Sequence, residues 1–341
     1  MTTTAQPAPA TAQLARPPSW WARANKATVV MAVVTFVVGV VFAVADPNFL
    51  SFANISNLAT QVAPALIVGV AMTFVITAGQ IDLSVGSIVA FVSATCAQLL
   101  VAGWDSSVVL VAGLLMGLGW GLVNGWFAAY QGIPAFIVTL ATLSVVRGFA
   151  LLQTEGFSVP IESWTFFARL GGARWLGFSI SAWIAVAVTI VGLVLLHRTR
   201  FGQYVVGIGA NEESVRRAGV DVRRVKMLAL GFSGLAAGVA GILIAARLGS
   251  GSANSAQGFE LTVIAAVVLG GTSLLGGRGT VVGTLIGAVL TGVIANGLTL
   301  VGVSPFLTPI ITGCVLILVI WINLRSAGVA ELVRRLTGRS S

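Results

Sequence analysis

The sequence has little of what catalysis, metal binding or covalent cross-linking requires. Its 341 residues include one histidine, His197, and two cysteines, Cys96 and Cys314, which both lie inside apolar runs. These residues predict neither a disulfide framework nor a metal site, and they leave no pairing of a nucleophile with a base. We therefore expect a protein that is not an enzyme, with no catalytic residue, no metal and no cofactor.

A nucleotide-binding loop is missing from the sequence as well. The phosphate-binding signature G-x-x-x-x-G-K-[ST] does not occur, and its nearest approximation, residues 271–278, lacks the Lys-Ser/Thr pair. The fragment 207–212 has two of the three glycines of a dinucleotide-binding turn and follows no predicted strand. The chain therefore has no energy source of its own.

Charged residues are also scarce, at 9% of the chain against 57% hydrophobic residues. Soluble domains have about 25% charged residues, so this composition indicates an all-α polytopic membrane protein. At roughly 20 residues per crossing, the apolar runs predict ten transmembrane helices. These runs lie near 27–45, 58–78, 85–103, 108–130, 133–152, 179–197, 227–247, 259–275, 281–299 and 304–322.

The basic residues predict the orientation of these spans. An even number of spans places both termini on one side, and loops on that side carry 15 of the 19 Lys and Arg residues, against Arg169 and Arg174 in the opposite loops. Because basic loops stay cytoplasmic, we expect both termini in the cytoplasm and the chain in the cell membrane. The net charge of +9 comes from these loops and tails, so we expect no nucleic acid partner. The expected regions are a disordered tail over 1–26, a transmembrane domain over 27–322 and a cytoplasmic tail over 323–341.

The longest charged segment is the loop Arg198–Lys226, which contains seven of the basic residues. Asn211 is suited to cap a helix over Glu212–Ala218, with Glu213 also in the first turn, where the helix dipole favours negative charge. Gly219 suits the left-handed conformation that ends such a helix. A short helix beneath a membrane bundle can be gripped by a soluble partner. The alternative is a solvated connector whose arginines only enforce the topology.

The outer loop 153–178 mixes aromatic residues with charges of both signs. Trp164 and Trp175 favour a helix at the level of the lipid headgroups, where indole rings gather. The alternative is a docking surface for an external protein.

Two short sequence patterns recur in the two halves of the chain. Ile81–Val85 resembles Phe259–Val263, and Asn124-Gly125 with a following Gly-Ile-Pro-Ala-Phe resembles Asn296-Gly297 with a following Gly-Val-Ser-Pro-Phe. Five predicted spans separate the copies, and because this number is odd the copies must point in opposite directions. The patterns predict an inverted internal repeat, with the substrate path between its two halves.

Asp82 and Glu260 are the carboxylates most embedded in apolar sequence. A carboxylate at mid-membrane costs about 2.5–3.5 kcal/mol on insertion scales, so such a residue usually faces a polar path or a partner. The alternative is helix capping: Asp82 would cap the helix that follows it, and Glu260 opens the eighth predicted span. The candidate path residues are Asp82, Ser84, Asn124, Phe136, Thr139 and Glu260.

Several blocks in fixed order resemble the permeases of monosaccharide-type ABC importers, the ribose, xylose and galactose group. Gly79–Ser87 is similar to that group's signature G-G-I-D-L-S-V-G-S, with Gln80 in place of the second glycine. The resemblance covers about residues 50–322. The other similar blocks are 132–140, Thr199–Gly202, Gly209–Glu213, Ala218–Val220, Gly258–Ser273 and Gly276–Gly279.

The resemblance implies a homodimeric permease with ten helices per subunit, a cytoplasmic ABC ATPase subunit and an extracytoplasmic sugar-binding protein as partners, and a small sugar as substrate. It also implies that Asn211–Gly219 is the coupling helix that seats in a cleft of the ATPase, with Gly209, Glu212, Glu213 and Ala218 at the contact. The missing phosphate loop is then explained, because ATP is hydrolysed on another polypeptide.

Two other functions fit parts of the same pattern. A permease of the same architecture would import branched-chain amino acids or nucleosides, and a ligand assay on its binding protein separates these from a sugar. A proton-coupled secondary transporter would instead use Asp82 and Glu260, and it would transport without an ATPase when a pH gradient is imposed.

The orientation is testable with single cysteines in a variant that lacks Cys96 and Cys314. We expect Glu162→Cys to react with an impermeant thiol reagent added outside intact cells, and Glu213→Cys to react only after the cells are opened. The opposite labelling pattern would overturn the orientation that the basic residues predict.

Overall fold

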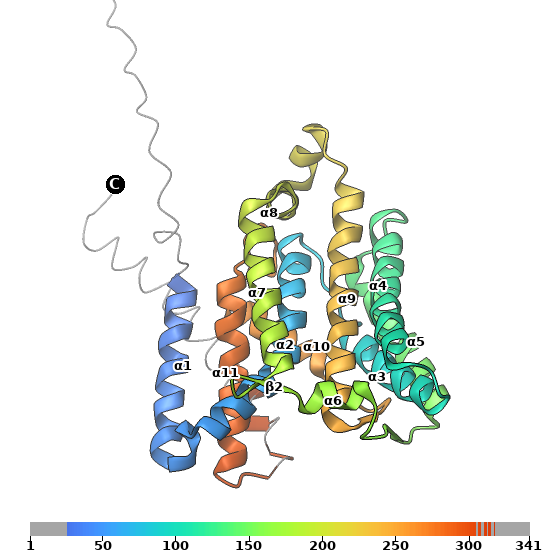
Figure 1. Cartoon of the computed structure of the whole chain (residues 1–341). Coiled ribbons are helices and arrows are strands. Elements are labelled where there is room, and N and C mark those ends of the chain that lie inside the picture. The colour runs from blue at the N-terminus through green and yellow to red at the C-terminus, as the bar shows by residue number, and fades with distance from the viewer. Residues whose placement is uncertain (1–25, 305, 308–309, 312, 315–316, 318–341) are drawn as a thin grey trace, which may run out of the picture.

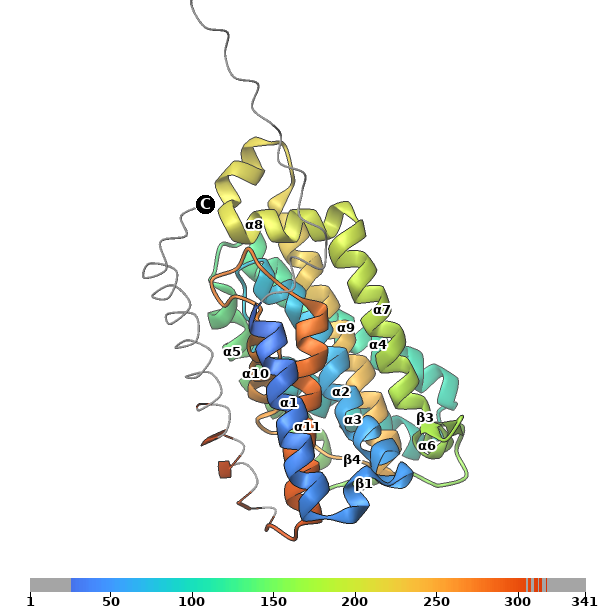
Figure 2. The same ribbon diagram turned by 90° about the vertical axis from the view of Figure 1, so that its left-hand side faces the viewer.

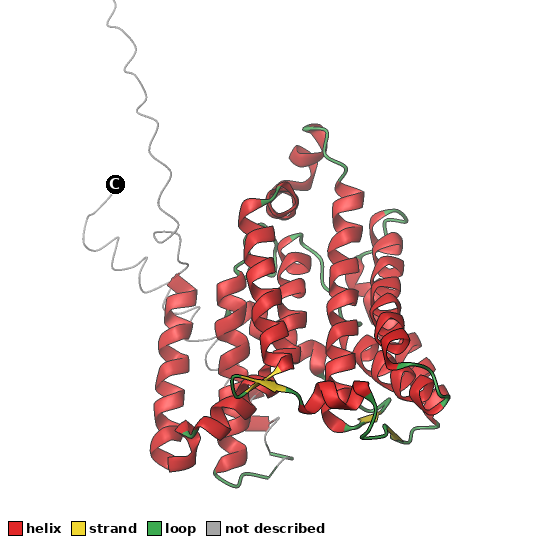
Figure 3. Cartoon of the chain, viewed as in Figure 1, coloured by secondary structure: helices red, strands yellow, loops and turns green. Residues whose placement is uncertain are grey.

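Helices make up most of the computed structural model and stand side by side as a bundle, whereas strands occur only as short pairs (Figures 1 and 3). The tails and most of the predicted tenth span over 304–322 lie outside the part of the chain that the structure describes. The described residues are 26–304, 306–307, 310–311, 313–314 and 317.

The elements follow one another in a simple order. The first half contains α1 (Lys26–Ala45), the 3-10 turn η2 (Pro47–Leu50), α2 (Phe52–Thr77), α3 (Val85–Val101), α4 (Ser106–Ala129) and α5 (Ala135–Thr154). An outer segment follows with β1 (Val159–Pro160), α6 (Phe166–Gly172), β2 (Arg174–Trp175) and β3 (Phe178–Ser179). The second half contains α7 (Ile180–Arg198), α8 (Arg200–Arg217), α9 (Val222–Leu248), β4 (Ser250–Gly251), α10 (Phe259–Leu269) and α11 (Val281–Leu300).

The strands form two short pairs at the end of the bundle opposite α8, and one of the pairs joins segments that are distant in sequence. β1 pairs with β4 in antiparallel register, with Val159 opposite Gly251, and β2 pairs with β3 as a small hairpin. Figure 2 shows β1, β4 and α6 together at one end of the helices and α8 at the other. Glu162 and Glu213 therefore lie at opposite ends of the bundle, as the labelling experiment requires.

The long helices confirm an all-α polytopic membrane protein. Among the described residues seven helices are long and apolar enough to cross a membrane, and α3 and α10 are shorter apolar helices. The predicted count of ten crossings is not confirmed. The prediction for 259–275 is wrong in its extent, because α10 ends at Leu269 and an 11-residue helix spans only about 16 Å.

Glycine explains why α10 stops early. Gly270 packs so closely against the backbone of Gly283 in α11 that a Cβ would collide with it, and Gly271 has a φ of 95° that L-residues rarely adopt. The chain therefore leaves the helix at this point and turns back toward α11. Hydropathy continued to favour helix here because it records apolar character and not backbone conformation.

The outer segment only partly matches an interfacial helix. α6 is seven residues long, and its Phe167 is fully buried whereas Phe166 and Trp164 are exposed. Thr165 caps it, because its hydroxyl accepts a hydrogen bond from the Ala168 amide at 3.1 Å. The helix is held to the bundle by the buried ring of Phe167 and by the contact of Gly171 with Ala246 of α9.

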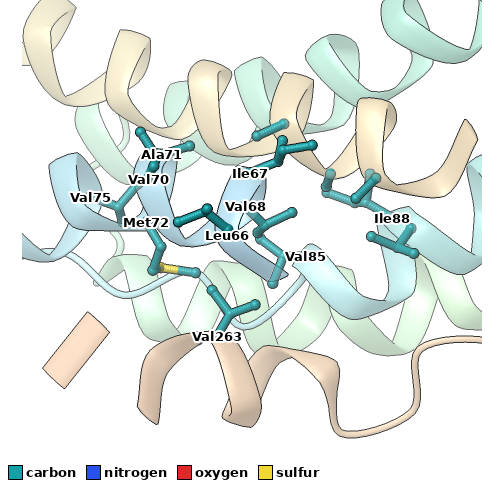
Figure 4. Close-up of a cluster of buried hydrophobic side chains, with 14 of the residues drawn as sticks. Leu66, Ile67, Val68, Val70, Ala71, Met72, Val75, Val85, Ile88 and Val263 are labelled. Carbon is teal, nitrogen blue, oxygen red and sulfur yellow. The ribbon is translucent and has the colours of Figure 1, made fainter. Parts of the chain in front are cut away.

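The core lies around α2 and α9, which are, with α11, the most buried of the long helices. Figure 4 shows side chains of α2 packed beside Val85 and Ile88 of α3 and Val263 of α10. Each short helix contacts the long central helix of the other half: α3 packs against α9 and α10 against α2. This crosswise packing supports the predicted inverted repeat.

Glycines bring α4 and α9 into backbone contact along most of α4. Gly113, Gly117, Gly121 and Gly125 recur every four residues on one face of α4, and a Cβ at Gly117 would lie 2.5 Å from the Gly234 carbonyl oxygen and 2.7 Å from the Gly238 Cα. Small residues let membrane helices approach closely enough for backbone atoms to pack, which replaces the hydrophobic drive that lipid does not provide.

Alanine substitutions on α4 should distinguish this contact from helix propensity. Gly117→Ala should lower stability by about 1–3 kcal/mol, because the added methyl group forces the two backbones apart. Gly119→Ala is the matched control: Gly119 has nothing within 4 Å of its Cβ position, so this change should be neutral or slightly stabilising. Thermal unfolding in one detergent measures both, and equal midpoints would contradict the close packing.

Candidate functional site

Two helix interruptions meet inside the bundle. After α2 the chain is unwound over residues 78–84, and after α9 it is irregular over 252–258. The N-terminal ends of α3 and α10 are in close contact. A Cβ added at Gly86 of α3 would collide with Glu260 Oε2 of α10 and would lie 2.9 Å from the carbonyl oxygen of Ala256, just before α10. Unwound segments and paired helix N-termini at membrane depth are typical of substrate sites in transporters, where backbone dipoles point into the path.

A chain of four side chains stabilises the first interruption. Asp82 Oδ1 accepts hydrogen bonds from the Ser84 amide at 2.9 Å and the Ser84 hydroxyl at 2.6 Å. Asn124 Nδ2 donates to Ser84 Oγ at 2.9 Å, and Asn124 Oδ1 accepts from the Thr142 hydroxyl at 2.6 Å. All four are buried, so α3, α4 and α5 are tied together by a satisfied polar network at the break.

Asp82 does not cap α3 in the predicted way. The N-cap residue of α3 is Ser84, which makes no side-chain capping bond, and Asp82 instead closes a tight turn two residues earlier. Its second oxygen, Oδ2, lies near Ser233 of α9, and neither Oδ2 nor the Ser233 hydroxyl makes a hydrogen bond of standard geometry. Asp82 therefore shapes the unwound segment and also faces the second half of the chain.

Thr139 and Phe136 lie near the start of α5, next to this network. The Thr139 hydroxyl donates to the Ile81 carbonyl oxygen at 3.1 Å and is fully buried, so it satisfies a backbone acceptor that unwinding leaves free. Phe136 is half exposed and lines a cavity at the α8 end of the bundle. Thr139 therefore contacts the unwound segment, whereas Phe136 lies in the wall of the cavity.

Glu260 lies on the opposite side, in the first turn of α10, where the helix dipole favours its charge. Gly258, not Glu260, is the N-cap residue, so the capping alternative for Glu260 is wrong. Its Oε2 is buried against α3 without a hydrogen-bond partner among the described residues. This oxygen can still accept a hydrogen bond, but α3 encloses it in this structure.

Arg147 is the residue near this site that sequence reasoning missed. It lies within α5, and its Nη1 donates to the Ala253 and Ser255 carbonyl oxygens, the latter at 2.9 Å. It therefore holds the irregular segment before α10 in place, and its charge interacts favourably with Glu260. A lone arginine inside an apolar run was the available signal, because such residues are costly in membranes unless they have partners.

The two buried asparagines of the repeated pattern both form interhelical contacts. Asn124 joins α4 to α3 and α5, and Asn296 of α11 exchanges a pair of hydrogen bonds with Asn54 of α2 at 2.9 and 3.0 Å. The partners differ, because Asn124 bonds within its own half of the chain and Asn296 bonds to the other half. Amides buried between membrane helices stabilise packing because no water is present to satisfy them otherwise.

The predicted coupling segment is part of a longer helical element. α8 begins at Arg200, and its first part is held against the bundle by buried Val205 and Ile208. The helix is interrupted at Asn211, whose φ of −161° and ψ of 95° are those of extended chain. Asn211 Oδ1 accepts a hydrogen bond from the Ser214 amide at 3.0 Å, which confirms the predicted cap.

Ion pairs stabilise the second part of α8. Arg216 lies 2.7 Å from Glu212, Arg217 lies 2.9 Å from Glu213, and Lys226 of α9 bonds to Glu212. Partial burial by itself would raise the pKa of Glu212, but Lys226 and Arg216 together hold that pKa below its usual value. The helix ends as predicted: Gly219 has a φ of 84°, and Ala218 donates its amide to the Ser214 carbonyl oxygen at 3.1 Å.

Gly209 connects α8 to the unwound segment. It packs so closely on the Thr77 carbonyl oxygen and the Gly277 amide that any side chain would collide with both. The Gly277 amide itself donates to the Thr77 carbonyl oxygen at 2.9 Å. The end of α2, the turn before α11 and the middle of α8 thus pack together in one junction next to residues 78–84.

A cavity of about 530 Å³ opens beside this junction at the α8 end of the bundle. Its walls come from the unwound segment, the α4–α5 loop and the second part of α8. The lining residues are 79–81, 128–136, Glu212, Arg216, Val222, Arg223 and Lys226. The cavity therefore joins the predicted coupling helix to the first helix interruption.

Substitutions at Asp82 should separate its geometric role from its charge. Asp82→Asn keeps an oxygen that accepts both Ser84 hydrogen bonds, so we expect near-normal folded yield and thermal stability. Asp82→Leu leaves the Ser84 donors unsatisfied and should cost about 1–3 kcal/mol. If Asp82→Asn is as damaging as Asp82→Leu in the same detergent, the charge and not the turn is what the fold requires.

Comparison with known proteins supports a transport role for this arrangement. The chain is 36% identical over 306 residues to the ribose import permease of Escherichia coli (strain K12), covering 89% of this chain and 94% of the relative. It is 38% identical to the ribose import permease of Bacillus subtilis (strain 168), over 84% of this chain and 90% of the relative. It is 39% identical to the L-arabinose transport system permease of Escherichia coli (strain K12), over 84% of this chain and 87% of the relative.

No solved structure matches the chain. The family described as branched-chain amino acid transport system / permease component matches residues 54–320, a stretch that contains both helix interruptions and the α8 segment. The chain belongs to this family of membrane transport permeases.

Proposed function

We propose that the chain is the permease subunit of an ABC importer for a monosaccharide, driven by ATP hydrolysis on a separate subunit. The observation that carries this proposal is the similarity, over 84–89% of the chain, to permeases named for ribose and arabinose import. The missing phosphate-binding loop agrees with an ATPase on another polypeptide. The permease itself then performs no catalysis.

The sugar path in this proposal passes between the two helix interruptions. Its support is the meeting of α3 and α10 at their N-termini and the unpartnered Oε2 of Glu260. Ser84, Asn124 and Thr139 position the unwound backbone on one side, and Arg147 positions it on the other. A neutral sugar suits such a site, because its hydroxyls both donate to carboxylates and accept from backbone amides.

Coupling in this proposal uses the second part of α8. A cytoplasmic ATPase that grips Glu212–Ala218 would move it about the interruption at Asn211. The Gly209 junction would carry this motion to the end of α2 and to residues 78–84. A partner that binds two conformations with different affinity shifts their populations, which is sufficient to open and close the path.

The remaining partners follow from the same proposal. An importer permease in the cell membrane, with α8 and both termini in the cytoplasm, receives sugar from an extracytoplasmic binding protein. A second copy of the permease completes a homodimer and encloses the path.

The family description favours one other substrate class, branched-chain amino acids. The experiment that separates the two is a ligand-binding assay on the partner binding protein. We expect it to bind a pentose or hexose, and sugar-loaded binding protein to stimulate ATP hydrolysis by the reconstituted complex. Binding of amino acids without binding of sugars would overturn the substrate assignment and leave the permease architecture intact.

Gly219→Val tests the coupling helix. Gly219 has a φ of 84° and open space around its Cβ position, so valine would strain the turn by roughly 1–2 kcal/mol without a steric clash. We expect normal permease abundance in the membrane, weaker co-purification of the ATPase and loss of sugar-stimulated ATP hydrolysis.

Gly156→Val is the matched control for this substitution. Gly156 has a φ of 79° and equally open surroundings, but it lies in the outer loop at the opposite end of the bundle. It should leave ATPase contact unchanged. Retained coupling in Gly219→Val, or equal loss in both variants, would mean that the contact lies elsewhere.

A further inference from the structure

The cavity at the α8 end of the bundle has features that transport of a neutral sugar leaves unexplained. Its volume of about 530 Å³ lies within the range of about 300–1,000 Å³ that is typical of sites for small organic molecules. Three basic side chains line it, those of Arg216, Arg223 and Lys226, against one carboxylate, that of Glu212. This excess of positive charge favours an anionic ligand.

Gln80 lines the same cavity and has a buried side chain without a partner. The residue is 6% exposed, and its Oε1 makes no hydrogen bond within the part of the chain that the structure describes. Buried polar groups are almost always hydrogen-bonded, because leaving one unsatisfied costs free energy. A ligand hydroxyl group that donates to this oxygen would remove that cost.

Gln80 is also the residue by which this chain departs from the sugar-permease signature, where the second glycine stands. The turn at this point is made by Gly79, with a φ of 74°, and by the backbone amide of Gln80, which donates to the Val75 carbonyl oxygen at 3.0 Å. Neither contribution uses the Gln80 side chain. Its amide group therefore adds to the cavity something that a glycine does not offer.

The start of α5 adds a second feature that suits an anion. Residues 132–136 form part of the cavity wall, and Pro134, the N-cap residue of α5, makes no side-chain capping bond. The first backbone amides of a helix have no partner within the helix, and the helix dipole places partial positive charge beside them. A 20-residue helix that begins uncapped at a basic cavity is suited to bind a phosphate group.

Arg223 is a basic residue of this cavity whose charge is not compensated. Arg216 pairs with Glu212 at 2.7 Å, and Lys226 pairs with the same carboxylate, whereas the guanidinium group of Arg223 is in no ion pair among the described residues. A guanidinium has five N–H donors in a planar fork that matches the oxygens of a phosphate group. Arg223 and the start of α5 therefore supply both charge and donors for such a group.

The second part of α8 connects the cavity with the aqueous phase. It forms one wall of the cavity, and the side chains of Arg217 and Glu213 on this helix are 79% and 54% exposed. In Figure 1 this part of α8 lies beyond the ends of the neighbouring helices. Such a position favours a ligand dissolved in water over the headgroup of a membrane lipid.

We infer that this cavity binds the phosphate ester of a small sugar from the cytoplasm, with the phosphate group at the start of α5 and Arg223 and a hydroxyl group at Gln80. The cavity wall supports the binding chemistry, whereas the cytoplasmic side and the effect on transport rest on the proposed function. The amide of Gln80 suits the sugar part, because an amide both accepts from hydroxyl groups and donates to them.

A ligand at this position would act on coupling. It would bridge the second part of α8, the start of α5 and residues 79–81, and so oppose the motion of α8 on which the proposed coupling depends. Phosphoryl transfer to an imported sugar yields a phosphate ester of this class. The site would therefore lower import when that product accumulates.

Isothermal titration calorimetry on the permease–ATPase complex, in nanodiscs of zwitterionic lipid, tests the binding, with ribose 5-phosphate as the probe and ribose as its neutral counterpart. We expect ribose 5-phosphate to bind, and Arg223→Gln to weaken binding by about tenfold or more at low salt. Arg224→Gln is the matched control: Arg224 is the next residue and is also exposed, but it does not line this cavity, so the loss should stay below about threefold.

Two substitutions of Gln80 test the part of the site that is particular to this chain. Gln80→Glu keeps the shape of the side chain and adds a negative charge, so it should weaken binding of ribose 5-phosphate by about tenfold or more. Gln80→Gly removes the amide and should weaken binding by about threefold to tenfold. Thermal unfolding shows whether each variant is folded, and Gln80→Gly keeps the test decisive if Gln80→Glu lowers the yield.

Sugar-stimulated ATP hydrolysis by the reconstituted complex tests the effect on coupling. We expect ribose 5-phosphate to lower this hydrolysis in the wild type and to have little effect in Arg223→Gln. Equal inhibition in both would overturn the inference, because the ligand would then act elsewhere in the complex. Absence of binding to the wild type, or equal losses of affinity in Arg223→Gln and Arg224→Gln, would overturn it as well.

Other outcomes identify a different occupant. Ribose that binds as tightly as ribose 5-phosphate, with the same dependence on Gln80, would overturn the inference in favour of a site for the neutral sugar. Phosphatidylglycerol that native mass spectrometry finds on the wild type and not on Arg223→Gln, and that displaces ribose 5-phosphate, would overturn it in favour of a lipid site. Binding of ribose 5-phosphate without stimulation of ATP hydrolysis by any sugar-loaded binding protein would support the site and contradict the proposed function.

Discussion

Direct contact between backbones at glycine is the interaction on which the rest of this structure depends. Lipid offers no hydrophobic drive for helices to associate, so membrane helices gain stability by packing closely. Here the contact recurs at three levels of the bundle: between α4 and α9, between α3 and α10 at Gly86, and at the α8 junction at Gly209. Each contact leaves no room for a side chain, and each fixes the relative position of two elements.

The helix interruptions are possible because their polar groups find partners inside the protein. Unwound backbone at membrane depth must be satisfied internally, since no water or lipid group will bond to it. Asp82, Ser84 and Thr139 satisfy the segment before α3, and Arg147 satisfies the carbonyl oxygens before α10. Two residues of the unwound segment and two residues of α5 thus maintain two breaks that face each other, and the path we propose lies between them.

The two ends of the bundle differ in how their charged residues are paired. At the α8 end arginine and lysine are paired with Glu212 and Glu213, which stabilises a short helix presented to solvent. At the other end Arg174 and Arg247 line a cavity without acidic neighbours. A surface whose charges pair with one another suits a contact governed by shape. A surface whose charges lack such pairs suits a contact governed by charge.

The sequence by itself determined the class of protein, the places of most spans, the family and the ends of the short helix after Asn211. These are local properties: hydropathy over about 20 residues marks a span, and Asn211, Glu212 and Gly219 mark the start and end of a helix within a few residues. The same local reasoning extended α10 beyond Leu269, because apolar composition does not reveal that Gly270 must pack against Gly283.

Only the tertiary structure decided which polar residues meet. Nothing in the spacing of Ser84, Asn124 and Thr142 indicates that three different helices bring them into one network, and nothing links Arg147 to the carbonyl oxygens of residues 253 and 255. The outer cavity likewise joins Arg174 to Arg247 through the packing of Gly171. Such contacts depend on how helices distant in sequence are placed, and that placement follows from the packing of the whole bundle.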